Sequence, residues 1–151
     1  MKKFSHKVTY AIMATLELGI RYGTSPIHAK AIAHNQSIPA RFIEHILSAL
    51  KQAGLVTSHR GAQGGYILRK EPAETSLAEI VQAINGATTT YNDNGSINGH
   101  QEIPTAHDAL LSGIWQQLHD AELAILRSIS LQTLMEQYQE LEDKRVLMYH
   151  I

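Results

Sequence analysis

The sequence predicts a mainly α-helical fold that carries a single small β-hairpin, and three observations lead to this fold class. Apolar residues in 39–53 recur at the spacing of a helix with one buried face. Residues 56–69 contain two short β-type runs separated by glycines. Residues 105–127 repeat apolar residues every three or four positions, which is typical of a long packing helix. Together they predict a winged helix-turn-helix with a long helix after it.

The composition bounds the class of protein. The chain has 151 residues, and 44% of them are hydrophobic, which is enough for one domain with a core or for one domain with an appended element. It has no cysteine, so disulfides, thiolate zinc sites and cysteine-held iron–sulphur clusters are excluded. No secretory signal follows the first lysines, and no apolar run approaches the roughly 18 residues of a membrane span. We therefore expect a soluble cytoplasmic protein.

Charge is divided unevenly along the chain. Residues 1–70 hold ten basic and two acidic side chains, whereas residues 71–151 hold three basic and twelve acidic ones. The balances of +8 and −9 give the net charge of −1. A basic half is typical of a surface that meets a polyanion such as double-stranded DNA. Chance segregation on a soluble surface is the alternative interpretation.

Ser5 is expected to cap a first helix that ends near Arg21. Lys3 and Lys7 lie at its N-terminus, where free N–H groups and the helix dipole attract a phosphate. The alternative is that these lysines only form a solvated end. Tyr10 lies on a flank of the helix, and the sequence supports a DNA contact and a place in the core equally well.

A helix-turn-helix pair is predicted at 28–52. Its first helix covers about 28–34, residues 35–37 break it, and Pro39 fits the first turn of the second helix. The second helix buries one apolar face, made of Phe42, Ile43, Ile46, Leu47 and Leu50. Its other face carries charged and polar side chains and is the predicted recognition surface.

The hairpin that follows has the form of a wing. Two short strands within 56–69 enclose a basic turn that carries Arg60 and three glycines. In a winged helix the recognition helix, here 39–53, enters the DNA major groove and the wing reaches alongside it. Ser76 and Glu79 then form a predicted capping box for a helix that stops at Gly86.

Residues 87–104 form the longest stretch without periodicity, and we expect it to be a poorly ordered loop. It separates a DNA-binding domain, 1–86, from a dimerisation helix and tail, 105–151. Thr105 can cap the long helix, which ends near Arg127. A short last helix is expected at about 131–141, with a partly apolar tail that docks on a partner.

The long helix is predicted to pack along its length against a second copy of the chain. Its seam and the adjacent tryptophan are Leu111, Ile114, Trp115, Leu118, Ala121 and Ile125. So broad an apolar surface is expected to be buried against another surface, and a second copy of the chain can supply it. A two-fold dimer also matches the symmetry of an inverted repeat in DNA. The alternative is that the helix only folds back on the first helix of its own chain.

The chain resembles the Rrf-two (Rrf2) family of bacterial winged-helix regulators along nearly its whole length. The resemblance is strongest at Tyr10-Ala11, Ile38-Pro39, Phe42-Ile43, Ile46-Leu47, Gly54-Leu55-Val56, Arg60-Gly61 and Gly64-Gly65-Tyr66. It implies a homodimeric transcription regulator, usually a repressor. The competing interpretation is a module that keeps this fold but signals through a partner protein and binds DNA weakly.

The resemblance also implies which side chains meet DNA. Arg41 and Glu44 would contact bases or phosphates, and Arg60 would reach the minor groove. Lysines would contact phosphate and set the salt dependence. The full predicted set is Lys3, Lys7, Tyr10, Arg41, Phe42, Glu44, His45, Lys51, Arg60 and Gln63.

One departure from the family concerns its cofactor. Several members hold an iron–sulphur cluster by three cysteines in the loop before the long helix, and this loop has none. His100 and His107 are weak metal ligands by themselves, so we expect neither a metal site nor a cofactor. The effector or partner protein stays unidentified. The chain has no nucleophile motif, phosphate loop or His-x-x-x-His pair, so an enzyme is not expected.

Overall fold

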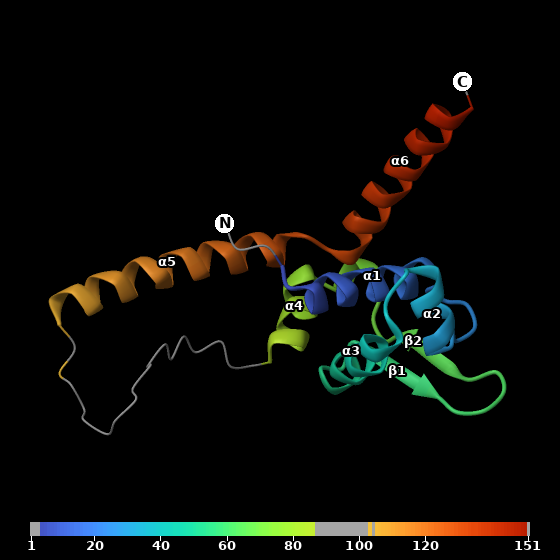
Figure 1. Ribbon diagram of the computed structural model, residues 1–151, viewed down its shortest axis with the longest axis horizontal. Helices are drawn as coiled ribbons and strands as arrows, with labels where there is room; N and C mark the ends of the chain where they lie inside the picture. The colour runs from blue at the N-terminus through green and yellow to red at the C-terminus, as the bar shows by residue number, and fades with distance from the viewer. Residues whose placement is uncertain (1–3, 87–102, 104, 151) are drawn as a thin grey trace.

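The computed structural model describes residues 4–86, 103 and 105–150. In chain order the elements are α1 His6–Ile20, α2 Ala29–Asn35, α3 Ala40–Gln52, β1 Val56–His59, β2 Gly65–Leu68, the 3-10 helix η1 Pro72–Glu74, α4 Leu77–Asn85, α5 Ala106–Ser128 and α6 Leu131–Tyr149 (Figure 1). The predicted class, mainly helical with one antiparallel hairpin, is confirmed. None of the described helices is both long and apolar enough to cross a membrane.

Helix α1 lies at the centre of the domain and contacts α3, α4, α6 and β2. Every residue from Ala14 to Gly19 is buried, including Thr15 and Glu17. The absence of a side chain at Gly19 lets Leu131 and Met135 of α6 approach α1 closely. The side chains that are most completely buried around it are Ile32, Ile46, Leu47, Leu50, Ile80 and Leu131. This one core therefore positions the helix-turn-helix, and it includes the first residue of α6.

The helix-turn-helix is confirmed with shifts of about one residue at its ends. Pro39 is the residue before the first turn of α3, not a member of that turn, and its φ of −58° suits either position. The helix ends at Gln52, and Gly54 follows with a φ of +76°, which glycine adopts without a steric penalty.

The wing has a contact that the sequence did not indicate. Val56 pairs with Leu68 and His59 with Gly65 across the hairpin, as expected for two antiparallel strands. In addition, Ile27 exchanges two backbone hydrogen bonds with Tyr66, of 2.8 and 3.1 Å. The segment before α2 thus forms an isolated β-bridge with β2, outside the two-stranded sheet, and it holds the wing against the helix-turn-helix.

Helix α4 begins with the predicted capping box. The hydroxyl of Ser76 accepts from the backbone N–H of Glu79, and the Glu79 carboxylate accepts from the backbone N–H of Ser76. The same carboxylate pairs with Lys70, just after the wing, at 2.5 Å. Burial raises the pKa of Glu79, but the hydrogen bonds from Lys70 and Ser76 and the charge of Lys70 outweigh it and hold the pKa below its usual value.

We expect Glu79→Gln to lower Tm by about 1–4 °C near neutral pH, because exposed ion pairs stabilise only weakly. A carboxyl whose pKa is lowered by folding stabilises above its unfolded-state pKa, and this stabilisation is lost as the pH falls through the folded-state value. The difference from the wild-type protein should therefore shrink as the pH falls below 4.5, the usual pKa of the group. Thermal melts of the two proteins between pH 3 and 7, with Glu140→Gln on α6 as the control, check this. A difference that is the same at every pH would contradict it.

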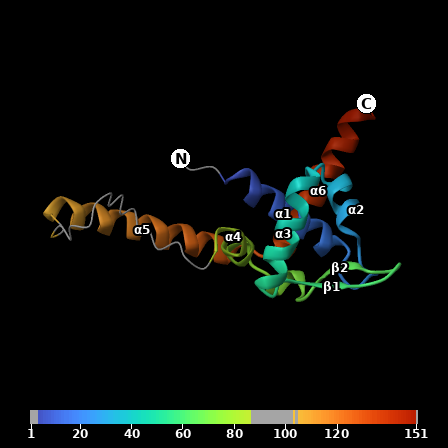
Figure 2. The same ribbon diagram turned by 60° about the horizontal axis from the view of Figure 1, so that its bottom comes forward.

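Helix α5 begins with a second capping box, formed by Thr105 and Asp108 as the spacing suggests. It packs against α4 through its C-terminal end, where Leu126 is buried beside Val81 and Leu77. The rest of α5 extends away from the winged domain in both views (Figures 1 and 2).

Helix α6 corrects one expectation. A short helix at 131–141 with a tail was expected, but α6 continues to Tyr149. The continuation contains no proline or glycine, and the Gln139–Asp143 hydrogen bond and the Arg145–Glu142 ion pair support it at helical spacing. The apolar residues of the expected tail therefore lie on a helix that projects from the domain (Figure 1).

Candidate nucleic-acid interface

Helix α3 presents one face to the core and the other to solvent. Its apolar face is buried, as the periodicity predicts. The side chains on the opposite face are exposed and include Arg41, Glu44, His45, Ser48 and Lys51. Because the core holds the helix from behind, these side chains point outward from a rigid support, which is the arrangement a groove-reading helix needs.

Two aromatic rings and a guanidinium order the start of α3. The guanidinium carbon of Arg41 lies 4.8 Å from the centroid of the Phe42 ring, and the Tyr10 ring lies 5.3 Å from Phe42. Phe42 and Tyr10 are half-buried and pack against the core. Of the two interpretations of Tyr10, the described contacts support the packed one, and they leave part of its ring accessible. The cation–π contact limits the rotamers of Arg41 before any ligand arrives.

The wing tip carries its predicted residues on an open turn. Arg60, Gly61, Ala62 and Gln63 are all exposed. Lys51, at the end of α3, donates to the hydroxyl of Ser58 at 2.7 Å, so this lysine also connects the recognition helix to the wing. The Lys51 ammonium keeps two further N–H donors for a phosphate.

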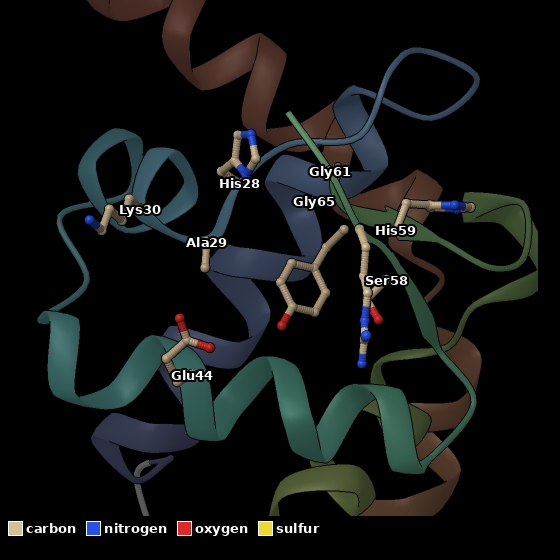
Figure 3. A pocket seen from close by; sticks show the side chains of 10 residues that line it. His28, Ala29, Lys30, Glu44, Ser58, His59, Gly61 and Gly65 are labelled. Atoms are coloured by element: carbon tan, nitrogen blue, oxygen red, sulfur yellow. The ribbon is translucent and has the colours of Figure 1, made fainter. Parts of the chain in front are cut away.

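A cleft of about 530 Å³ lies where α2, α3 and the wing meet. Figure 3 shows Glu44 of α3 turned towards it, with His28 and Lys30 at the α2 side and Ser58 and His59 at the wing side. Tyr66 lines it too. Burial raises the pKa of the Tyr66 hydroxyl, and the negative charge of Glu44 raises it further.

The sequence predictions missed His28, Lys30 and Tyr66 as members of this surface. In the sequence, His28 and Lys30 are basic residue types at the start of the predicted shorter helix. Their approach to Glu44 depends on the backbone pairing of Ile27 with Tyr66, which no local pattern indicates. The cleft therefore brings basic side chains from the α2 side and the wing side, Lys30 and Arg60, to the same surface as the carboxylate of Glu44.

The remaining predicted residues are dispersed. Lys7 is exposed in the first turn of α1, and Lys3 and His100 lie outside the described residues, as does the expected loop at 87–104 apart from residue 103. His107 is exposed in the first turn of α5. Among the residues that the structure describes, no three His, Cys, Asp or Glu side chains form a group suited to a metal ion.

The predicted dimerisation seam is exposed in the single chain. Leu111, Ile114, Trp115, Leu118 and Ile125 each keep between 47% and 61% of their surface accessible, and Leu110 keeps 64%. In the described residues α5 packs against α4, and it shares a buried cluster with Val8 of α1 only at its C-terminal Leu126. The exposed stripe is therefore not covered by a fold-back of α5 along α1. A stripe of this size on one helix face is larger than the scattered apolar side chains of ordinary surfaces.

A core-supported helix with an exposed polar face, a second helix across its start and a glycine-tipped hairpin beside it define a winged helix-turn-helix DNA-binding protein. The family model of Rrf2, described as an iron-dependent transcriptional regulator, matches residues 4–137. The chain belongs to the Rrf2 family and is a DNA-binding transcription regulator. The resemblance stated from the sequence is thereby confirmed.

Individual relatives and solved structures match this chain over most of their own length. The chain is 28% identical over 147 residues to the transcriptional regulator CymR of Bacillus subtilis, which covers 97% of this chain and 99% of that protein. The structure of T. potens IscR matches with a TM-score of 0.72 and 27% identity, over 93% of this chain and 90% of that one. The structure of CymR, the global cysteine regulator of B. subtilis, matches with a TM-score of 0.69 and 29% identity, over 91% and 98%.

The description of the family as iron-dependent raises the question of whether this chain fits an iron centre. The donor set does not fit a cluster held by thiolates, because the chain has no cysteine. His107 stands alone as an exposed imidazole at the start of α5. The residues of this chain therefore do not fit an iron–sulphur cluster held by thiolates.

Proposed function

We propose that the protein is a homodimeric repressor that binds an inverted repeat in double-stranded DNA and acts in the cytoplasm. One observation carries the proposal: the apolar stripe of α5 stays uncovered in a chain whose winged domain already has a complete core. A second copy related by a two-fold axis covers the same stripe on both chains and places two recognition helices on one face of DNA.

The distal part of α6 adds to the surface that a partner would cover. Its exposed apolar side chains are Leu141, Val146, Leu147, Met148 and Tyr149. These residues lie in the second half of α6, whose first residue, Leu131, is buried in the core. Docking of this segment on the partner chain, as expected for the tail, would remove a second apolar surface from water.

In the proposed complex, α3 enters the major groove and the wing lies along the minor groove. We assign Arg41 and Glu44 to base edges, where Glu44 would also penalise sites that bring a phosphate close. His45, Lys51 and Gln63 on α3 and the wing, and Lys7 on α1, are exposed and are assigned to phosphate and edge contacts. The role is binding, and we assign no catalytic reaction and no cofactor to the chain.

Genome-wide capture of the protein with its bound DNA tests the proposal, together with light scattering to obtain the oligomeric mass. Enriched sites that share an inverted repeat, and a mass of two chains, are the expected results. A shallow dependence of DNA affinity on salt, with no enriched sites, would favour the alternative module that signals through a partner protein.

Arg60→Ala is expected to weaken binding to the enriched site by about 1–3 kcal/mol, because one guanidinium is lost from the wing tip. The loss should exceed the loss on duplexes of unrelated sequence if Arg60 reads a narrow minor groove. Arg127→Ala is the matched control, since it removes an exposed arginine from α5, outside the proposed DNA interface. Fluorescence anisotropy with both duplexes measures the effect, and equal affinities of Arg60→Ala and the wild-type protein would exclude this role.

A further inference from the structure

Glu17 is a carboxylate in an unusual place. It lies on α1, within the apolar core side of that helix, and only 7% of its surface is exposed. Its oxygens accept hydrogen bonds from the Nε of Arg21 at 3.0 Å, the Nδ2 of Asn35 at 2.9 Å and the Nε2 of Gln36 at 2.8 Å. A buried charge persists only when such partners replace the water that it loses.

The partners of Glu17 lie at the turn between the two helices of the DNA-binding motif. Asn35 is the last residue of α2, and Gln36 is its C-terminal cap. Ser37 then adopts a φ of +53°, a left-handed conformation that a residue with a Cβ takes only under constraint. The N–H of Ile38 bonds to the carbonyl of Ala33 at 2.9 Å, and α3 begins two residues later.

The same contacts favour the ionised form of the Glu17 carboxyl group. Burial raises the pKa of the carboxyl, but the hydrogen bonds from Asn35, Gln36 and Arg21 and the charge of Arg21 outweigh it, so the pKa lies below its usual value. Glu17 is therefore ionised at neutral pH and accepts from all three donors at once. An amide in its place has one carbonyl oxygen and cannot do so.

Apolar packing restricts the angle of α3 but leaves it some range. The core contacts of α2 and α3 are made by aliphatic side chains such as Ile32, Ile43 and Ile46, and the packing of such side chains favours a crossing angle only to within about 15–20°. Hydrogen bonds to a carboxylate are directional and short. The Glu17 contacts thus supply the directional constraint at the point where the chain turns into the recognition helix.

We propose that Glu17 is a positioning residue for DNA recognition: it clamps the α2–α3 turn through Asn35 and Gln36 and so sets the pose of α3 in the groove. The inference rests on the proposed entry of α3 into the major groove. Glu17 lies away from the proposed DNA surface, and in this role it contributes to sequence specificity as well as to stability.

The test uses a duplex that the wild-type protein enriches from a random-sequence pool, and an unrelated duplex of equal length. Glu17→Gln should weaken binding to the enriched duplex by about 5- to 30-fold, the effect of one or two lost hydrogen bonds to a charge, and should change binding to the unrelated duplex by less than about 2-fold. Gln36→Ala, a milder change in the same network, should act in the same direction. The double variant should be no worse than Glu17→Gln, because the two changes remove one interaction.

Ile80→Val is the matched control, since it removes a methyl group from the core at α4, away from the turn. Compared at temperatures equally far below their respective Tm values, this control should keep the wild-type preference for the enriched duplex. In the free proteins, hydrogen exchange of the Ser37 and Ile38 amides should be faster in Glu17→Gln and Gln36→Ala and unchanged in Ile80→Val.

The outcomes separate two failures. If the wild-type protein enriches no duplex, the proposed function fails, and the exchange rates still report on the clamp. If the wild-type protein enriches a duplex, equal sequence preference of Glu17→Gln, or the same loss of preference in the Ile80→Val control, would overturn the positioning role. Unchanged exchange at Ser37 and Ile38 would also overturn it.

Discussion

Replacing Leu118 with Asp should convert the proposed dimer into a monomer and weaken binding to the inverted repeat by at least about 100-fold, because a charge placed in an apolar interface costs several kcal/mol and occurs in both chains. Leu118 lies in the middle of the exposed stripe of α5, and 56% of its surface is accessible in the single chain. A monomer would bind a single half-site and lose the gain that comes from linking two sites.

Gln116→Ala is the matched control for this substitution. Gln116 lies on the opposite side of α5, where it donates to Asp120 at 2.9 Å. Light scattering and anisotropy on one full site and one half-site measure mass and affinity together. A Leu118→Asp protein that keeps the mass of two chains, or a wild-type protein with the mass of one, would refute the assignment of the stripe.

The second large effect is expected at Gly65, the first residue of β2. Its φ is +136°, and a Cβ built there would lie 2.5 Å from both the carbonyl carbon and oxygen of Ile27. Both atoms belong to the backbone, so no side-chain rotation relieves the contact. Gly65→Ala must therefore push the wing away from the segment before α2 and break the two hydrogen bonds between Ile27 and Tyr66.

We expect Gly65→Ala to lower the free energy of unfolding by about 1–3 kcal/mol more than Gly61→Ala does, which is the usual cost of overpacking. Gly61 is the matched control because its φ is +108° but a Cβ added to it would have no neighbouring atom within 4 Å. The control thus carries the backbone strain without the collision. Urea titrations of both variants measure the difference, and equal stabilities would show that the approach of Ile27 is not rigid.

Gly65→Ala should also reduce DNA binding beyond its effect on stability, since the wing would no longer be registered against α2. The variant is best compared with the wild-type protein at a temperature where both are folded. If Gly65→Ala binds the enriched site with the affinity of the wild-type protein, the wing binds DNA without the hydrogen bonds between Ile27 and Tyr66.

Local rules in the sequence were sufficient for most of the elements. Ser76 and Thr105 each precede an acidic residue at the third following position, and both form the capping boxes that this spacing predicts. Gly54 and Gly86 follow the ends of α3 and α4 with positive φ. These features involve groups within a few residues of each other, so the sequence itself contains both partners.

The end of α6 shows where local reasoning was insufficient. The stretch after Leu141 lacks a strong apolar periodicity, so the sequence alone predicts a tail there. It is helical because its residues favour the helix and its charged side chains pair within one turn. A weak pattern with good helix formers is ambiguous when the neighbouring surfaces are unknown.

The sequence by itself determined the fold class, the order of the helices, the wing and the apolar stripe of α5, because each depends on periodicity, capping or turn residues that act over short distances. The tertiary structure decided the burial of Glu17, the pairing of Ile27 with Tyr66 and the cleft around Glu44. In each of these, residues separated along the chain come into contact. No pattern in the helix of Glu17 indicates that Asn35 and Gln36 donate hydrogen bonds to its carboxylate. Long-range contacts of this kind follow from how the helices pack together, and a one-dimensional pattern does not contain that information.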